Sequence, residues 1–217
     1  RIAGLMPRTA ELLIAILGTW RIGEVYQPLF TAFGPKAIEQ RLSCSKARWL
    51  LTDPHNRSKL DEIADCPNII VVGADRLDLD DFDFWDVLSQ HSADCPPALL
   101  DGNAPFLLMC TSGTTGPAKP LEVPLRAILA FKSYMRDAIE LRDDDRFWNL
   151  ADPGWAYGLY YAVTGPLALG QATTFFDGPF SVESTCRVID KYAITNLAGS
   201  PTAYRMLIAA GQAFAEP

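Results

Sequence analysis

The chain has 217 residues, 49% of them hydrophobic, which is enough apolar material to bury a substantial core and argues against disorder. The formal net charge of −7 argues against nucleic-acid binding, because that function needs clustered Lys and Arg to replace counterions along a phosphate backbone. No apolar run approaches the roughly 18–20 residues that a membrane span requires. Five widely spaced cysteines without a CxxC pair are typical of a reducing compartment, so we expect a cytoplasmic protein.

The first part of the chain alternates between helical and strand patterns. Apolar residues recur at helical spacing over 9–23, with Thr9 placed to cap the helix and Gly23 suited to its end. Short apolar runs at 25–26, 48–52 and 69–73 indicate strands, and helix-compatible stretches near 35–44 and 54–64 separate them. This alternation predicts an α/β fold.

The segment 73–102 is acidic and contains prolines, which predicts an excursion over the surface. We interpret its aspartates most simply as a solvent-exposed face of the protein. We expect Phe82, Phe84 and Trp85 to hold part of the segment to the body of the protein, with a short helix over about 82–90.

A second α/β set of elements follows. Strands are predicted at 105–110, 146–150, 171–176 and 194–198, and helices at 125–140, 156–168, 182–191 and 201–211. The chain therefore divides into a first α/β subregion, 1–102, and a second subregion, 103–217, that contains the loop described next.

The most informative segment directly follows the strand at 105–110. It reads Thr111-Ser112-Gly113-Thr114-Thr115-Gly116-Pro117-Ala118-Lys119. Glycine lets the backbone come close to a ligand, successive N–H groups and hydroxyls can bind anionic oxygens, and Lys119 adds a mobile positive charge. The alternative interpretation is an ordinary turn with a surface lysine. The run of consecutive small hydroxyl and glycine residues directly after a strand counts against it. A Walker A loop is excluded, because Gly113 leads to Ala118-Lys119-Pro120 instead of Gly-Lys-Ser/Thr.

The loop resembles the phosphate-binding signature Thr-Ser-Gly-Thr-Thr-Gly-x-Pro-Lys-Gly of the adenylate-forming, or AMP-binding, enzymes. The first six positions and Lys119 agree, but Ala118 replaces the usual proline and Pro120 the usual glycine. Because proline fixes φ and has no N–H, Pro120 is expected to push the Lys119 backbone toward an extended geometry. The resemblance implies that residues 111–116 and Lys119 contact the phosphates of ATP.

Two further motifs carry the resemblance. The stretch 149–158 looks like the acetyl- and medium-chain acyl-CoA synthetase branch, which implies that Trp155 lines the acyl pocket and that Gly158 keeps space open beside it. A packed aromatic core is the other interpretation of the tyrosines nearby. The stretch 198–205 resembles an Ala-Pro-Thr-Ala segment near the acyl and pantetheine path. Together the motifs imply part of the large N-terminal domain of the adenylate-forming fold, with mixed or parallel sheets flanked by helices.

Other catalytic sites find little support in the sequence. His55 and His91 are the only histidines, no GxSxG is present, and no Cys/His spacing suits zinc, so triads and metalloproteases are excluded. No metal-ligating residue is predicted. The run 143–145 of three aspartates is best explained as a solvated acidic loop.

The resemblance implies an enzyme that uses ATP, Mg²⁺, a carboxylic acid and CoA. The acid forms an acyl-adenylate with release of pyrophosphate, and the acyl group then passes to the CoA thiol. The sequence ends at Pro217, before the family's adenine-stacking Tyr-Gly-x-Thr-Glu region and its mobile C-terminal domain. We therefore expect a front fragment that does not complete adenylation alone. The alternative is a non-catalytic nucleotide-binding or structural module that self-associates through surface exposed by truncation.

Overall fold

The computed structural model describes residues 1–111 and 119–211. The chain packs as two compact units, Arg1–Ala127 (unit 1) and Ile128–Pro217 (unit 2), and each is described by itself. The predicted subregions 1–102 and 103–217 stay a prediction, because a packing boundary does not test a division based on motifs. None of the helices in the described residues has both the length and the apolar character needed to cross a bilayer.

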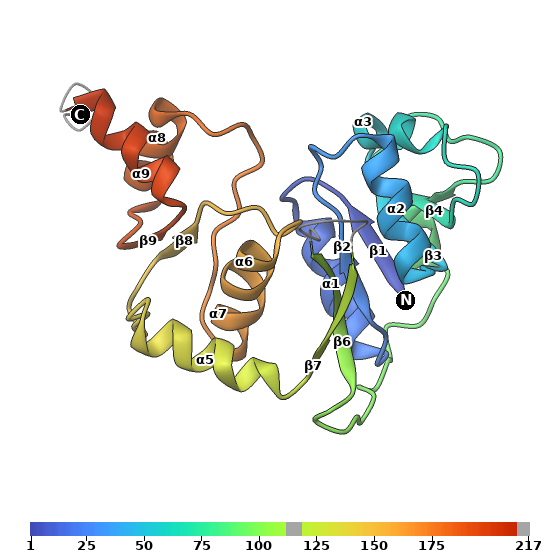
Figure 1. Cartoon of the computed structure of the whole chain (residues 1–217), viewed down its shortest axis with the longest axis horizontal. Coiled ribbons are helices and arrows are strands. Elements are labelled where there is room, and N and C mark those ends of the chain that lie inside the picture. The colour runs from blue at the N-terminus through green and yellow to red at the C-terminus, as the bar shows by residue number, and fades with distance from the viewer. Residues whose placement is uncertain (112–118, 212–217) are drawn as a thin grey trace. The chain divides into compact units, whose positions relative to one another are not determined.

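Unit 1 is built around a seven-stranded sheet with the strand order β5-β4-β3-β1-β2-β6-β7. The strands are β1 (Ile2–Leu5), β2 (Tyr26–Pro28), β3 (Trp49–Thr52), β4 (Asn68–Val71), β5 (Phe82–Asp83), β6 (Pro105–Thr111) and β7 (Lys119–Pro124). Neighbouring strands are parallel, except that β6 and β7 pair antiparallel. The unit runs from blue to green in Figure 1.

Helices follow the parallel strands along the chain of unit 1. They are α1 (Ala10–Arg21) after β1, α2 (Pro35–Ser45) after β2, α3 (Pro54–Arg57) with a 3-10 turn (Ser58–Leu60) after β3, and α4 (Phe84–Ser89) after β5. This alternation confirms the predicted α/β fold, a sheet dominated by parallel strands and flanked by helices.

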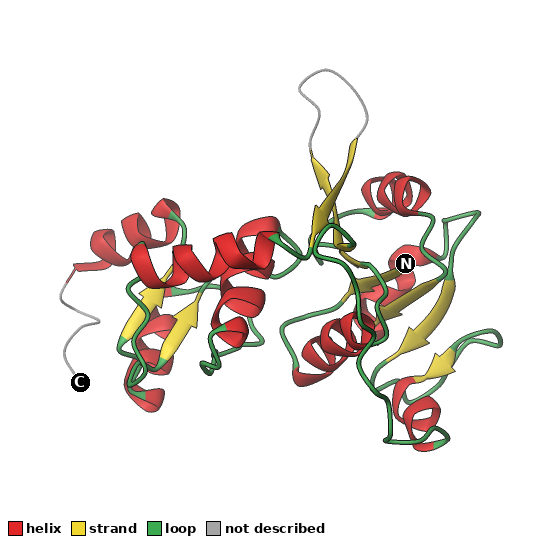
Figure 2. Cartoon of the chain, turned by 90° about the horizontal axis from the view of Figure 1, so that it is seen from below, coloured by secondary structure: helices red, strands yellow, loops and turns green. Residues whose placement is uncertain are grey.

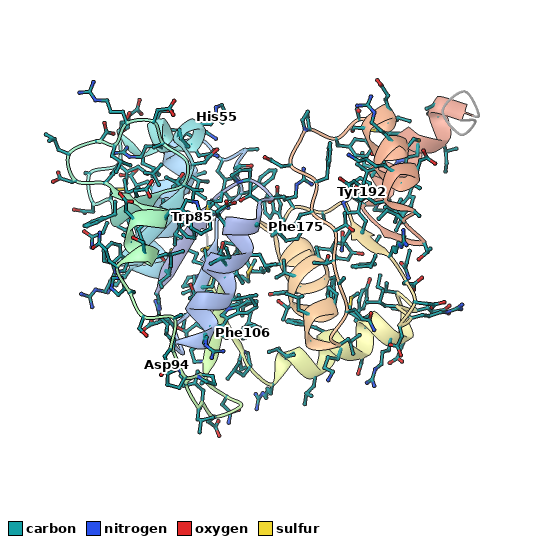
Figure 3. The ribbon with its side chains drawn as sticks, turned by 180° about the vertical axis from the view of Figure 1, so that it is seen from behind. His55, Trp85, Asp94, Phe106, Phe175 and Tyr192 are labelled. Atoms are coloured by element: carbon teal, nitrogen blue, oxygen red, sulfur yellow. The ribbon has the colours of Figure 1, made fainter. Side chains whose placement is uncertain are left out.

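Helix α1 begins and ends where the sequence predicts. Thr9 Oγ1 accepts a hydrogen bond from the backbone N–H of Leu12 at 3.5 Å, and Gly23 adopts a φ of +77° just after the helix. Trp20 Nε1 donates to the carbonyl oxygen of Phe106 at 3.0 Å, and the centroids of the two rings lie 5.3 Å apart. Figure 3 shows Phe106 beside this helix. The contact holds α1 against β6.

One hydrophobic core of unit 1 lies where α2 and the α3 region cover the sheet. Its buried side chains come from the strands, helices and connecting segments, and they are Ala3, Leu5, Leu29, Ile38, Leu42, Leu50, Leu60, Ile63, Ile69 and Val71. Full burial of each leucine or isoleucine contributes about 1.5–3 kcal/mol. Burial of this apolar set is what makes the helices pack onto the sheet.

The acidic segment 73–102 takes part in an ion-pair cluster that the sequence did not predict. Arg57 pairs with Asp61, Asp78 and Asp81 at N–O distances of 2.6, 3.1 and 2.6 Å. The side chain of Asp81 is only 4% exposed, so the prediction of a solvated face is wrong for this residue. Burial lowers the pKa of Arg57, but the hydrogen bond and the charge of Asp81 outweigh burial and raise that pKa.

Phe82 and Phe84 hold this segment to the body of unit 1 as expected, whereas Trp85 is 51% exposed and packs on the ring of Phe84. Phe84 is buried at the start of α4, and the Phe82 ring packs on Trp49 of β3 with a centroid distance of 5.5 Å. Asp83 caps α4 by accepting two backbone N–H hydrogen bonds of the first turn, each 2.8 Å long. The helix predicted near 82–90 is confirmed.

Unit 2 combines a two-stranded parallel sheet with helices. Its elements are α5 (Ala127–Asp137), β8 (Phe147–Asn149), α6 (Ala156–Gly158), a π-helical segment (Leu159–Thr164), α7 (Gly165–Ala168), α8 (Val182–Tyr192), β9 (Asn196–Ala198) and α9 (Pro201–Ala210). The predicted strand at 171–176 is wrong. Gly170 turns the chain with a φ of +78°, and the segment then meets the sheet at one bridge between Thr174 and Trp148.

The helix predicted at 156–168 exists, but its middle is π-helical over Leu159–Thr164. Pro166 has no N–H and cannot donate to the carbonyl oxygen of Ala162. That carbonyl oxygen instead accepts a hydrogen bond from Thr173 Oγ1 at 2.8 Å. The proline and the outside donor together account for the departure from α-helical geometry.

The substitution Arg57→Ala leaves the buried carboxylate of Asp81 without its partner. We expect the free energy of unfolding of unit 1 to fall by roughly 1–3 kcal/mol in urea denaturation. The control is Arg187→Ala, since Arg187 pairs with Glu183 where both side chains are 68% exposed. Its loss should be about 0.5 kcal/mol or less. Equal losses in the two variants would contradict the structural role of Arg57.

Candidate functional site

The predicted phosphate loop begins on β6 and ends on β7. Residues 112–118, which include the predicted contacts from Ser112 to Gly116, lie outside the described residues. Thr111 and Lys119 are opposite each other in the antiparallel register, and Thr111 Oγ1 donates to the carbonyl oxygen of Lys119 at 3.3 Å. Figure 2 shows the two strands as adjacent arrows. The two ends of the loop are therefore held together.

The loop leaves the sheet of unit 1 at its carboxyl edge. Strand β6 runs parallel to β2, with Leu107 opposite Tyr26, so Thr111 lies beyond the carboxyl ends of the parallel strands. Ligands of open α/β sheets bind outside this edge. Lys119 begins an extended strand, as expected from Pro120, and β7 is an outermost strand, where proline is tolerated.

A small polar network closes the base of the hairpin. Asp101 Oδ1 accepts hydrogen bonds from the backbone and side-chain N–H groups of Asn103 at 2.8 and 2.9 Å, and these hydrogen bonds lower the pKa of Asp101. Arg126 donates to Asn103 Oδ1 at 2.6 Å and, through its backbone N–H, to the carbonyl oxygen of Gly102 at 2.8 Å. Hydrogen bonds therefore hold both the base of the hairpin and the two described residues that border the loop, Thr111 and Lys119.

The second motif, residues 149–158, forms a tight turn after β8. Asn149 Oδ1 accepts from the backbone N–H of Ala151 at 2.9 Å, and Asp152 Oδ1 accepts from that of Gly154 at 2.7 Å. The backbone N–H of Trp155 donates to the carbonyl oxygen of Asp152 at 3.0 Å. Trp155 is 45% exposed at the start of α6.

Gly158 lies against this turn, where the backbone leaves no open space. A Cβ atom at position 158 would lie 2.1 Å from the carbonyl oxygen of Asp152 and 2.8 Å from the nitrogen of Pro153. Glycine is therefore needed for a close approach of two backbone segments. The roles of Trp155 and Gly158 in an acyl pocket stay predictions.

The second and third motifs meet at a shallow pocket of about 200 Å³ in unit 2. Its lining is mostly apolar and consists of Leu150, Ala151, Phe180, Ser200, Thr202, Ala203 and Met206. The second motif, residues 149–158, supplies Leu150 and Ala151. The third motif, residues 198–205, supplies Ser200, Thr202 and Ala203. The sequence did not predict Phe180 and Met206 as lining residues. Their apolar side chains were the one feature that could have indicated this role. Trp155 and Gly158 are not among these described lining residues.

The third motif fixes the start of α9. Ser200 Oγ accepts a hydrogen bond from the backbone N–H of Ala203 at 3.3 Å, and Pro201 occupies the first turn. The hydroxyl of Tyr204 donates to the carbonyl oxygen of Leu197 in β9 at 2.6 Å. The start of α9 is thus capped by Ser200, and Tyr204 joins the helix to β9.

Aromatic side chains pack between α5 and the helix that follows the second motif. The Tyr161 ring stacks on Tyr134 at 4.1 Å, and the Tyr160 ring stacks on Phe131 at 4.4 Å. Burial, together with a hydrogen bond to Tyr134, raises the pKa of Tyr157 to about 12. These contacts agree with the interpretation of the tyrosines as packed aromatic residues.

Within residues 1–111 and 119–211 no group of three or more His, Cys, Asp or Glu side chains is placed to hold a metal ion. In the acidic run, Asp145 accepts hydrogen bonds from the backbone N–H of Arg142 at 2.9 Å and from Thr195 Oγ1 at 2.8 Å. These bonds lower the pKa of Asp145. Asp143 and Asp144 are exposed, in agreement with the predicted solvated loop, and the hydrogen bonds of Asp145 also tie this loop to the chain before β9.

The sequence profile of the family described as AMP-binding enzyme matches residues 1–216. The chain belongs to this family. It is 30% identical over 235 residues to the acetyl-coenzyme A synthetase of Magnetococcus marinus, an alignment that covers 98% of this chain and 36% of that relative. It is 31% identical over 213 residues to the acetyl-coenzyme A synthetase of Bacillus subtilis, covering 97% and 37% of the two chains.

A solved structure of the AMP-binding family agrees with the fold. The crystal structure of Brucella canis acyl-CoA synthetase matches with a TM-score of 0.95 and 54% sequence identity, covering 99% of this chain and 40% of that one. The chain thus spans about 36–40% of the length of these relatives. The predicted family and the predicted partial α/β domain are both confirmed.

The substitution Gly158→Ala places a methyl group against the carbonyl oxygen of Asp152. We expect the free energy of unfolding of unit 2 to fall by about 1–3 kcal/mol, measured in urea, because the backbone must shift. Gly18→Ala is the control, since no atom lies within 4 Å of its added Cβ and the position is helical. That variant should be neutral or stabilised by up to about 1 kcal/mol. A neutral Gly158→Ala would contradict the close packing.

The raised pKa of Tyr157 predicts a loss of stability at high pH. An unfolded tyrosine ionises near pH 10, whereas Tyr157 in the fold ionises near pH 12. The stabilising contribution is therefore complete below about pH 10 and is lost as the pH rises toward 12. We expect the urea midpoint of unit 2 to fall over this window and to fall less in Tyr157→Phe. The exposed Tyr192→Phe is the control, and equal pH slopes in both variants would contradict the assignment.

Proposed function

We propose that this chain supplies the phosphate-binding part of an ATP-dependent acyl-CoA synthetase. In that reaction a carboxylate attacks the α-phosphorus of ATP and pyrophosphate leaves, and the acyl group then passes from AMP to the thiol of CoA. The observation that carries the proposal is the placement of the Thr111–Lys119 loop. Its two ends are paired at the carboxyl edge of the sheet, in a member of the AMP-binding family.

The loop would offset charge repulsion in the first step. A carboxylate that approaches the triphosphate is repelled by it, so positive charge and N–H or O–H donors near the phosphates favour the attack. We assign these donors to residues 111–116 and the positive charge to the exposed ammonium group of Lys119. Pairing of Thr111 with Lys119 supports this assignment, because it keeps both ends of the loop near the same ligand.

We propose that Mg²⁺ arrives bound to the phosphates of the nucleotide and is not held by a dedicated cluster of side chains. Within the described residues no cluster of three ligating side chains exists, and Mg²⁺ characteristically binds through phosphate oxygens and water with few protein ligands. When bound, it would neutralise part of the phosphate charge. The chain's own contribution is then to orient the phosphates through the loop.

We assign the carboxylic acid to unit 2. The apolar pocket formed by Leu150, Phe180 and Met206 offers contacts for an acyl chain. Trp155 ends the turn that carries Leu150, and Gly158 packs against that turn. The close packing of Gly158 supports an indirect role, in which the glycine fixes the turn that carries Leu150 and Ala151. A small or medium acid would suit a pocket of about 200 Å³.

We further propose that this chain binds nucleotide but does not complete adenylation alone. The support is its share of the relatives, 36–40% of their length, because in-line attack requires several groups to be aligned at once. Cytoplasmic localisation and self-association stay predictions. CoA would be a substrate of the complete enzyme.

A non-catalytic module is the second candidate function. Pro120, opposite Cys110 in the register, removes an N–H at the exit of the loop and supports a vestigial loop. In that case the chain would fold and pair with partners without binding phosphate. The two candidates differ in their response to ATP.

Thermal unfolding with Mg²⁺ and ATP separates them. A ligand that binds only the folded state at about 100-fold above its Kd should raise the Tm by roughly 5–10 °C. We expect this shift in the unaltered chain and its loss in Lys119→Ala, while Lys36→Ala, an exposed lysine of α2, keeps it. A chain that shows no shift, with Lys119→Ala equally stable, would favour the module.

Exchange of labelled pyrophosphate into ATP tests the second part of the proposal. With a panel of small and medium acids, the chain alone should give no exchange above the blank, whereas an intact acetyl-CoA synthetase gives robust exchange. Robust exchange by this chain would overturn the claim that it cannot adenylate alone. It would leave the assignment of the loop intact.

A further inference from the structure

One buried amide of unit 1 contacts Cys110 and the part of α2 that carries Cys44. Gln27 is only 1% exposed, and its Nε2 donates to the carbonyl oxygen of Arg41 in α2 at 2.9 Å and to Cys110 Sγ in β6 at 3.6 Å. Cys44 follows Arg41 by three residues, which is nearly one helical turn. The amide of Gln27 therefore connects the thiol of Cys110 to the part of α2 that carries Cys44.

The side of α2 that carries Cys44 faces this region. Ala37, Arg41 and Cys44 recur at helical spacing and are all half-buried, beside the fully buried residues of the same helix. Helix α2 also contacts β7, the strand in which Pro120 lies opposite Cys110. Helix spacing therefore places Cys44 on the side of α2 near Gln27, and the strand register places Cys110 near the same amide.

The electrostatics of Cys110 agree with this placement. Burial raises the pKa of the Cys110 thiol, and a thiolate at Cys44 raises it further, because two negative charges close together repel each other. The hydrogen bond from Gln27 and the charge of Arg41 act in the opposite direction. This repulsion agrees with the position of Cys44 on the part of α2 that the Gln27 amide contacts.

We propose that Cys44 and Cys110 form a dithiol site that hydroperoxides oxidise to an intramolecular disulfide between α2 and β6. One thiolate attacks a peroxide oxygen, the O–O bond breaks, and the leaving hydroxide takes up a proton to form water. The resulting sulfenic acid is attacked at sulfur by the second thiolate, the S–O bond breaks, and a second water leaves. One hydrogen peroxide is thus reduced to two waters as two thiols are oxidised to one disulfide.

The disulfide would act on the base of the phosphate loop. Cys110 directly precedes Thr111, and its partner in the register, Pro120, directly follows Lys119. A covalent bond from Cys110 to α2 would therefore tie both described loop ends covalently to that helix. The site uses only the packing of unit 1 and does not depend on the proposed binding of ATP.

The test compares folded and unfolded chain after treatment with hydrogen peroxide. Remaining thiols are blocked with N-ethylmaleimide, and tryptic peptides are identified by mass spectrometry. We expect titratable thiols to fall from five to three and the peptide Leu42–Lys46 to become linked to the peptide 77–126. In the folded chain the link should form at least about tenfold faster than in urea, because the fold holds the sulfur atoms together.

Serine variants assign the link to the two cysteines. Cys44→Ser and Cys110→Ser should each keep all remaining thiols, whereas Cys95→Ser and Cys186→Ser should lose two thiols like the unaltered chain. Cys95→Ser is the sharpest control, because Cys95 lies in the same tryptic peptide as Cys110. A link that persists in Cys110→Ser, oxidation of Cys110 to sulfinic acid without a link, or no loss of thiols in the folded chain would overturn the proposal.

Discussion

Strand β6 takes part in two kinds of hydrogen-bond ladder, parallel to β2 on one side and antiparallel to β7 on the other. The parallel ladder brings its carboxyl end to the edge of the sheet where ligands bind in α/β proteins. The antiparallel ladder returns the chain to the same edge, so that Thr111 and Lys119 face each other. A slip of one residue in this register would exchange the faces of β7 and separate the two ends. The position of the two described loop ends therefore depends on the pairing between these strands.

Unit 2 is organised by a close approach of two backbone segments. Gly158 allows the start of α6 to lie against Asp152, and this contact positions the turn that presents Leu150 and Ala151 to the pocket. The opposite wall comes from α9, whose start is set by the cap of Ser200. A residue that never lines the pocket thus shapes it, because a tight turn has few other conformations that satisfy its hydrogen bonds.

The sequence predicted those features that local chemistry determines. The predicted cap Thr9 indicated the start of the first helix, and the loop and its motifs indicated the family. It did not predict β1 or β7. Strand β7 contains two prolines, which count against a strand unless it lies at the edge of a sheet. The burial of Asp81 also depends on a partner 24 residues away, Arg57, and no local pattern reveals such a pairing.

Binding a phosphate and activating a carboxylate place different demands on a chain. A phosphate can be held by one contiguous loop, because donors from a few successive residues are sufficient. In-line attack instead requires the carboxylate, the α-phosphorus and the compensating charges to be aligned together, and such alignment is lost when supporting parts are missing. Because this chain spans 36–40% of the length of its relatives, the first demand can be met within it more readily than the second. The proposed behaviour, nucleotide binding without turnover, rests on this difference between the two tasks.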